Sequence, residues 1–98
     1  MSKFNYRNGV VYAEDIPAKS LAEKYGTPLY VYSANSFREI YRNYTSASKT
    51  ALVCYSVKSC SSIGVLSLMA SLGSGFDIVS GGELQRALRA GADPHKIV

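Results

Sequence analysis

Long hydrophobic runs are absent from this sequence. No apolar stretch approaches the ~20 residues that a membrane-spanning helix needs, and residues 1–5 lack the apolar core of a secretion signal. These absences argue against a membrane protein and against a secreted one. We therefore expect a soluble, cytoplasmic protein that has no membrane partner.

Metal-binding side chains are also scarce. The chain has one histidine, His95, and two cysteines, Cys54 and Cys60, whose spacing matches no zinc-binding motif. We therefore expect no metal site. Neither cysteine has a plausible bridging partner, and a cytoplasmic environment keeps thiols reduced, so both are expected to be free.

Clusters of positive charge are missing too, although the chain is basic, with a formal net charge of +4 and a pI near 9.2. The 11 lysine and arginine residues are scattered along the chain with acidic residues between them. No basic run and no glycine-aromatic RNA-binding motif occurs. We expect no nucleic-acid partner.

What the sequence does contain is typical of a folded domain, with 47% hydrophobic and 18% charged residues in 98. Asn8-Gly9 lies between two runs of β-forming residues and predicts a tight hairpin. Asp15 and Pro17 then open a predicted helix, which Gly26 ends.

A short strand is predicted over residues 29–32. It is followed by an amphipathic helix, because aromatic and aliphatic side chains recur at positions 37, 40, 41 and 44. Ser33 or Asn35 is the expected N-cap of this helix. Residues 45–49 are polar and predict a link that could join two domains.

From residue 50 onward, strands and helices alternate. The predicted strands cover residues 52–58 and 76–79, with a third starting at residue 97, and the predicted helices cover 63–72 and 80–91. The first of these helices is expected to bury Ile63, Leu66, Met69 and Ala70. This regular alternation indicates the α/β class, with a parallel sheet or barrel. A closed (β/α)8 barrel takes roughly 250 residues, so we expect the N-terminal part of a longer chain, or a truncated product.

Two polar residues in the predicted strands are candidates for chemistry. Lys58 ends a strand on the face that also carries Cys54 and Ser56, at the carboxyl end where parallel α/β folds place their active sites. Such a lysine is either a solvated strand end or a Schiff-base amine. Asp77 interrupts an apolar strand and therefore needs solvent, a hydrogen-bonding partner or a cation.

The other candidates have structural explanations as well. Ser80 and Glu83 have the spacing of a capping box, which would account for Glu83 without any site. The glycines at 73, 75, 81 and 82 match no nucleotide-binding motif and are expected to form turns. His95 is expected to be an exposed residue at a helix start.

The motif that contains Lys58 is familiar. Residues 55–58 (Tyr-Ser-Val-Lys), together with residues 72–84 and 90–98, resemble the pyridoxal-phosphate barrel of the fold-type III amino-acid decarboxylases. Residues 4–6 and 25–33 are similar to the start of the diaminopimelate decarboxylase branch of that family. The resemblance covers nearly the whole chain.

The resemblance implies a role for each candidate. Lys58 would be the catalytic residue and would bind pyridoxal 5'-phosphate covalently, while Asp77 and Glu83 would line or support the cofactor site. Residues 1–34 would belong to a second, β-rich domain, and residues 35–98 would begin the pyridoxal-phosphate-binding (β/α)8 barrel. Where the family commonly has Ala-Asn after the lysine, this chain has Ser59-Cys60, so the hydrogen bonds that the asparagine amide would make near the cofactor would be absent.

The implied reaction is the decarboxylation of meso-2,6-diaminopimelate to L-lysine and carbon dioxide, a step of lysine biosynthesis, by a homodimer. Decarboxylases of ornithine, arginine or carboxynorspermidine on the same barrel are the first alternative. A non-catalytic fragment that binds the cofactor is the second. Because the family's phosphate-binding turns and substrate-binding residues are not found in this chain, we expect the 98 residues on their own to be inactive.

Overall fold

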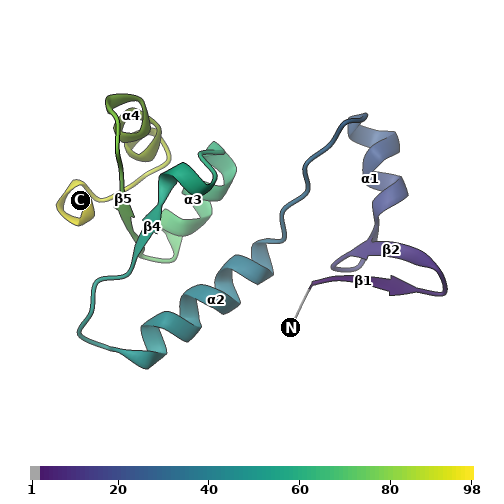
Figure 1. Cartoon of the computed structure of the whole chain (residues 1–98), viewed down its shortest axis with the longest axis horizontal. Coiled ribbons are helices and arrows are strands. Elements are labelled where there is room, and N and C mark those ends of the chain that lie inside the picture. Colours follow the sequence, from purple (N-terminus) through teal and green to yellow (C-terminus); the bar gives the residue numbers. More distant parts are fainter. Residues whose placement is uncertain (1–2) are drawn as a thin grey trace. The chain divides into compact units, whose positions relative to one another are not determined.

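The computed structural model describes residues 3–98, which fall into two compact units (Figure 1). One unit ends at Phe37 and the other covers Arg38–Val98. Helix α2 (Ala34–Ala47) begins in the first unit and continues in the second. The assignment of residues 1–34 to a β-domain and of residues 35–98 to a barrel stays a prediction.

The first unit contains the predicted hairpin. Strand β1 (Phe4–Arg7) pairs antiparallel with strand β2 (Val10–Ala13). At the turn, Asn8 and Gly9 both have positive φ, 53° and 79°. A type I′ turn requires positive φ at both central residues, and asparagine and glycine adopt it most readily, so the prediction is confirmed.

A third strand follows where the sequence predicted the start of a helix. Strand β3 (Ile16–Pro17) pairs with β2, and helix α1 (Ala18–Tyr25) begins only after it. The ring of Pro17 fixes its φ angle at −60°, which suits an extended residue as well as a helical one. The proline alone therefore did not show at which residue helix α1 begins. Gly26, at φ 83°, ends α1 as predicted.

The strand predicted over residues 29–32 is wrong. These residues form irregular structure after a cis peptide bond between Thr27 and Pro28. A strand needs a neighbour that accepts and donates its backbone hydrogen bonds, and no strand within residues 3–98 pairs with this segment. Its side chains are largely exposed, and Tyr30 is 86% exposed.

Helix α2 begins as predicted but is longer than predicted. Ser33 is its N-cap, because the Ser33 hydroxyl accepts a hydrogen bond of 3.1 Å from the backbone N–H of Ser36. The helix continues to Ala47, so the first three residues of the predicted link at 45–49 are helical.

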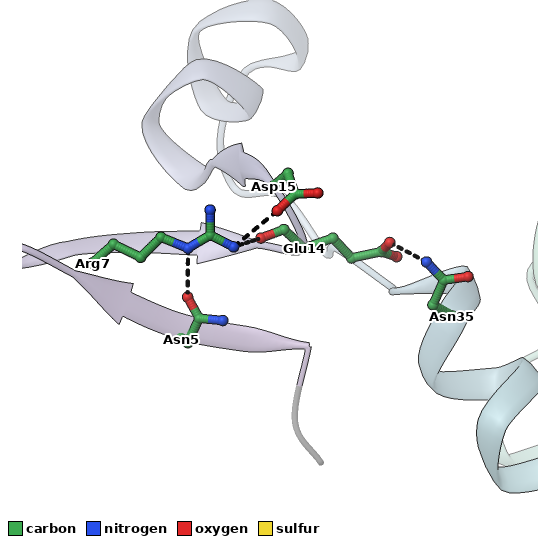
Figure 2. Close-up of polar contacts among 5 residues, drawn as sticks. All are labelled: Asn5, Arg7, Glu14, Asp15 and Asn35. Carbon is green, nitrogen blue, oxygen red and sulfur yellow. Dashed lines mark hydrogen bonds and ion pairs between the residues drawn. The ribbon is translucent and has the colours of Figure 1, made fainter.

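A carboxylate from the end of the hairpin also lies at the start of α2. Glu14 accepts a hydrogen bond of 2.7 Å from the Ser33 hydroxyl. It accepts another from the side-chain amide of Asn35 (Figure 2). The Ser33 hydrogen bond is the main cause that lowers the pKa of Glu14 below its usual range. A negative charge at a helix N-terminus is stabilising, because the unpaired backbone N–H groups there carry partial positive charge.

Arg7 holds the segment that carries Glu14. Its guanidinium donates to the Glu14 carbonyl oxygen at 2.9 Å and to the Asp15 carboxylate at 3.0 Å, while its Nε donates to the Asn5 side chain at 3.2 Å (Figure 2). The same guanidinium lies 4.6 Å from the centre of the Tyr12 ring. These contacts fix the residues between β2 and β3, where Glu14 has a positive φ of 54°.

The second unit is built on parallel strands. Strand β4 (Cys54–Ser56) pairs in parallel with strand β5 (Gly75–Asp77) (Figure 1). On the other side of β5, Phe76 forms a parallel bridge with Ile97. The three segments are therefore adjacent in chain order. This order confirms the parallel β-α arrangement predicted from the sequence.

Both strands are shorter than predicted. Strand β4 stops at Ser56 because the chain turns there into a short 3₁₀ helix, η1 (Val57–Ser59), in which the Val57 side chain is completely buried. Strand β5 covers Gly75–Asp77 instead of residues 76–79. Lys58 thus lies in the turn after a strand and not on the strand face that alternation predicted.

The helices of this unit agree more closely with expectation. Helix α3 (Ile63–Ser71) and helix α4 (Gly81–Arg89) are followed by glycines with positive φ, 89° at Gly73 and 101° at Gly91. A second 3₁₀ helix, η2 (Pro94–Lys96), precedes Ile97, which forms the bridge to Phe76. No helix in the described part of the chain is long and apolar enough to cross a membrane.

The core of the second unit lies between the strands and their helices. Val57, Leu66 and Phe76 are completely buried there. Further buried apolar side chains are Val65, Met69, Ala87 and Ala92. Leu66 and Met69 are buried as predicted, whereas Ile63 is 37% exposed, because it lies at the first residue of α3.

Candidate functional site

Lys58 lies on an exposed turn, directly after a completely buried residue. The preceding residue, Val57, is completely buried, while the Lys58 side chain is exposed. Within residues 3–98 the Lys58 amine makes no hydrogen bond and no ion pair. The backbone is therefore anchored beside Lys58 while its amine is available to a ligand.

Asp77 lies at the same end of the strand pair. It is the last residue of β5 and is the register partner of Ser56, the last residue of β4. Asp77 is half-buried, and its carboxylate has no hydrogen-bonding partner among residues 3–98. The parallel register thus brings the chain segments of Lys58 and Asp77 to one edge, the carboxyl edge of the sheet, where α/β folds place ligands.

Glu83 belongs to the loop and helix that follow β5. The Ser80 hydroxyl accepts from the Glu83 backbone N–H at 3.1 Å, and Glu83 Oε1 accepts from the Val79 N–H at 3.0 Å. This arrangement confirms the predicted cap, although the return hydrogen bond comes from Val79 and not from the N-cap residue itself. Helix α4, which carries Glu83, packs against η1, which carries Lys58.

One further residue of this region, Tyr55 of β4, was not among the candidates predicted from the sequence. Its hydroxyl donates a hydrogen bond of 2.9 Å to the backbone carbonyl of Cys60, and its ring meets Phe76 edge to face at 6.4 Å. Along a strand, Tyr55 alternates with Cys54 and Ser56 and falls on the same face as the apolar Val53 and Val57, a pattern that favours a packing role. The hydroxyl contact depends on the turn at η1, which no local sequence signal predicts.

The remaining candidates have local structural roles. His95 is exposed, and the Asp93 carboxylate caps η2 by accepting from the His95 backbone N–H at 3.0 Å. That hydrogen bond is the main cause that lowers the pKa of Asp93. Cys54 and Cys60 are free thiols. Residues 3–98 contain no group of three or more histidine, cysteine or acidic side chains that could hold a metal ion.

A comparison with known families gives the class of protein to which this chain belongs. Residues 34–98 match the model of the family described as pyridoxal-dependent decarboxylase, pyridoxal binding domain. The match covers well over half of the chain, so the chain belongs to this family. The family membership and the parallel β-α order confirm the predicted fold class, an α/β chain corresponding to the N-terminal part of a barrel enzyme.

Individual proteins of this family are also similar to the chain. A diaminopimelate decarboxylase of Haemophilus influenzae is 53% identical over the whole of this chain, which covers 24% of that protein. A solved structure from Aquifex aeolicus matches 97% of this chain with a TM-score of 0.92 and 44% identity. A diaminopimelate decarboxylase from m. jannaschii, solved in co-complex with L-lysine, matches 97% with a TM-score of 0.89 and 34% identity.

The chain spans about a quarter of the length of each of these relatives, 24% in all three comparisons.

The candidate side chains of this chain have the chemical groups that would bind a pyridoxal group. An unpaired primary amine is the group that reacts with an aldehyde, and Lys58 supplies one. Asp77 adds a carboxylate without a partner in residues 3–98, and Glu83 holds the backbone of the loop between β5 and α4.

Proposed function

We propose that this chain supplies the lysine-bearing part of a pyridoxal-phosphate-dependent decarboxylase that converts meso-2,6-diaminopimelate to L-lysine and carbon dioxide. One observation carries the proposal. In a chain of this family, Lys58 carries an unpaired amine two residues after Ser56, the register partner of Asp77, at the carboxyl edge of two parallel strands. The choice of substrate is supported by the names of the relatives and by the L-lysine in the m. jannaschii structure.

The cofactor supplies the electron sink that decarboxylation needs, because its ring takes up the electrons left when carbon dioxide departs. In this proposal Lys58 Nζ would hold the cofactor and would afterwards hold or return a proton at that nitrogen. The Asp77 carboxylate would accept a hydrogen bond from the bound group and orient it. Glu83 Oε1 keeps the Val79 N–H engaged, which fixes the loop between β5 and α4.

A substrate comparison tests this function. The protein, purified at its natural length and supplied with pyridoxal phosphate, is incubated with diaminopimelate, ornithine, arginine or carboxynorspermidine. We expect lysine and carbon dioxide in equal amounts from diaminopimelate, and little product from the other three. A preference for one of the other three substrates would move the assignment to the related decarboxylases.

Matched lysine variants test the role of Lys58 in the same assay. Lys58→Ala is expected to abolish lysine formation, because no other amine occupies the turn after β4. Lys49→Ala removes another exposed lysine, from the segment before β4, and is expected to leave the rate unchanged. Equal activity of both variants would remove Lys58 from the reaction.

The alternative of a non-catalytic cofactor-binding fragment concerns the 98 residues taken on their own. We expect no decarboxylation from them, because they span only about a quarter of the length of the three relatives. Lysine formation from diaminopimelate by the purified 98-residue chain would contradict this expectation. Covalent cofactor binding without turnover would support the fragment as a binder.

We further propose that the protein acts as a homodimer in the cytoplasm on a small amino acid, without a nucleic-acid or membrane partner. The family resemblance supports the dimer, and the scattered basic residues support the absence of a nucleic-acid partner. Light scattering at the protein's natural length tests the dimer. A monomeric mass together with full activity would contradict it.

A further inference from the structure

The hydrogen bond from Tyr55 closes a small loop of backbone around Lys58. The Tyr55 hydroxyl reaches the carbonyl of Cys60 at 2.9 Å, five residues further along the chain. Between these two residues lie the end of β4 and the 3₁₀ helix η1 (Val57–Ser59). The side chain of one residue therefore bridges the segment that presents the candidate catalytic lysine.

The Tyr55 ring is itself well anchored. Tyr55 and Phe76 are register partners on β4 and β5, and their rings meet nearly at a right angle, 79°, with centres 6.4 Å apart. Phe76 is completely buried. An edge-to-face pair with a buried partner restricts the Tyr55 ring, so the hydroxyl position is determined by the core of the unit.

Lys58 is thus supported on both sides. The buried Val57 side chain fixes the backbone before it, and the Tyr55 hydrogen bond fixes the Cys60 carbonyl after it. A 3₁₀ helix has weaker hydrogen-bond geometry than an α-helix and runs for only a few residues, so η1 needs such outside contacts to keep one conformation.

We propose that Tyr55 is a positioning residue for Lys58, which acts through its hydroxyl to hold the η1 turn in the conformation that presents the amine. This inference rests on the proposed cofactor attachment at Lys58. Covalent reaction of an amine with an aldehyde depends on holding the two groups in a defined geometry, and a turn that samples several conformations holds it less often. Removing the hydroxyl should therefore slow attachment while leaving the core packed.

The test compares Tyr55→Phe with the unsubstituted protein, both purified at natural length without cofactor. Pyridoxal phosphate is added, samples are reduced with borohydride at successive times, and peptide mass spectrometry measures the labelled fraction at Lys58 and at the exposed Lys49. We expect labelling of Lys58 to be about fivefold slower in Tyr55→Phe, the factor that matches the loss of one hydrogen bond of typical strength. Labelling of Lys49 is expected to stay unchanged.

Tyr44→Phe is the matched control, because it removes the hydroxyl of a largely exposed tyrosine in α2, and it is expected to label Lys58 at the original rate. Ser59→Gly loosens the same turn without altering Tyr55 and is expected to slow labelling as well, which keeps the test valid if Tyr55→Phe does not fold. Equal Lys58 labelling rates in the unsubstituted protein and in Tyr55→Phe would overturn the positioning role. If Tyr55→Phe does not fold, equal rates in the unsubstituted protein and in Ser59→Gly would overturn it. No label at Lys58 in the unsubstituted protein would overturn the proposed attachment, and this inference with it.

Discussion

Among the described glycines, Gly75 has the least room for a Cβ atom, and this leads to a quantitative prediction. A Cβ atom added at this first residue of β5 would lie 2.6 Å from the Cys54 sulfur and 2.7 Å from the Lys96 carbonyl oxygen. The first contact is with a side chain that can rotate, but the second is with backbone. Gly75→Ala therefore requires β5 and the chain near Lys96 to separate by several tenths of an ångström.

Overpacking of this kind costs about 1–3 kcal/mol. We expect Gly75→Ala to lie at the upper end, about 3 kcal/mol less stable, because backbone must move. Denaturant unfolding followed by circular dichroism measures the change in the free energy of unfolding. The reasoning would be refuted if Gly75→Ala were as stable as the unsubstituted chain.

Gly64→Ala is the matched control, because it adds the same methyl group at a glycine in α3 whose Cβ would meet only the Ser62 hydroxyl, at 3.8 Å. Alanine is favoured over glycine within a helix by up to about 1 kcal/mol. The two substitutions should therefore change stability in opposite directions. A loss of stability in both would show that the glycine contacts do not decide the outcome.

Two further predictions concern carboxylates. The pKa of Glu14 is lower in the folded chain than in the unfolded one. Its contribution to stability is therefore present above the unfolded pKa and is lost as the pH falls through the folded pKa. Glu14→Gln should accordingly make the loss of stability with falling pH less steep, which acid unfolding followed by circular dichroism measures. Asp77→Asn should leave the unfolding midpoint almost unchanged, since its carboxylate has no partner in residues 3–98, but should weaken cofactor binding about tenfold, as expected for the loss of a hydrogen bond to a charged group. Titration with pyridoxal phosphate measures the second effect, and unchanged affinity would remove Asp77 from the site.

The features that the sequence predicted correctly depend on local chemistry. Asn8-Gly9 selects a turn with positive φ, Gly73 ends a helix, and Ser80 with Glu83 caps the next one, and each of these signals operates within a few residues. The alternation of strands and helices could also be predicted, because the spacing of apolar residues along a strand or a helix is a local signal.

The features that the sequence did not predict depend on contacts between distant residues. Residues 29–32 have the composition of a strand, but a strand forms only beside a partner. The position of Glu14 at the N-terminus of α2 depends on how the hairpin folds back, 19 residues before Ser33. The Tyr55 hydroxyl contact depends on the turn at η1, which the burial of Val57 produces.

The assignment of Lys58 as the site of cofactor attachment is the central claim, and mapping the attachment tests it most directly. The protein at natural length is saturated with pyridoxal phosphate, reduced with borohydride, digested and examined by peptide mass spectrometry, with Lys58→Arg treated in parallel. We predict one stoichiometric label on the peptide that contains Lys58, and its loss in Lys58→Arg. Stoichiometric label on another lysine, or an unchanged label in Lys58→Arg, would contradict the account.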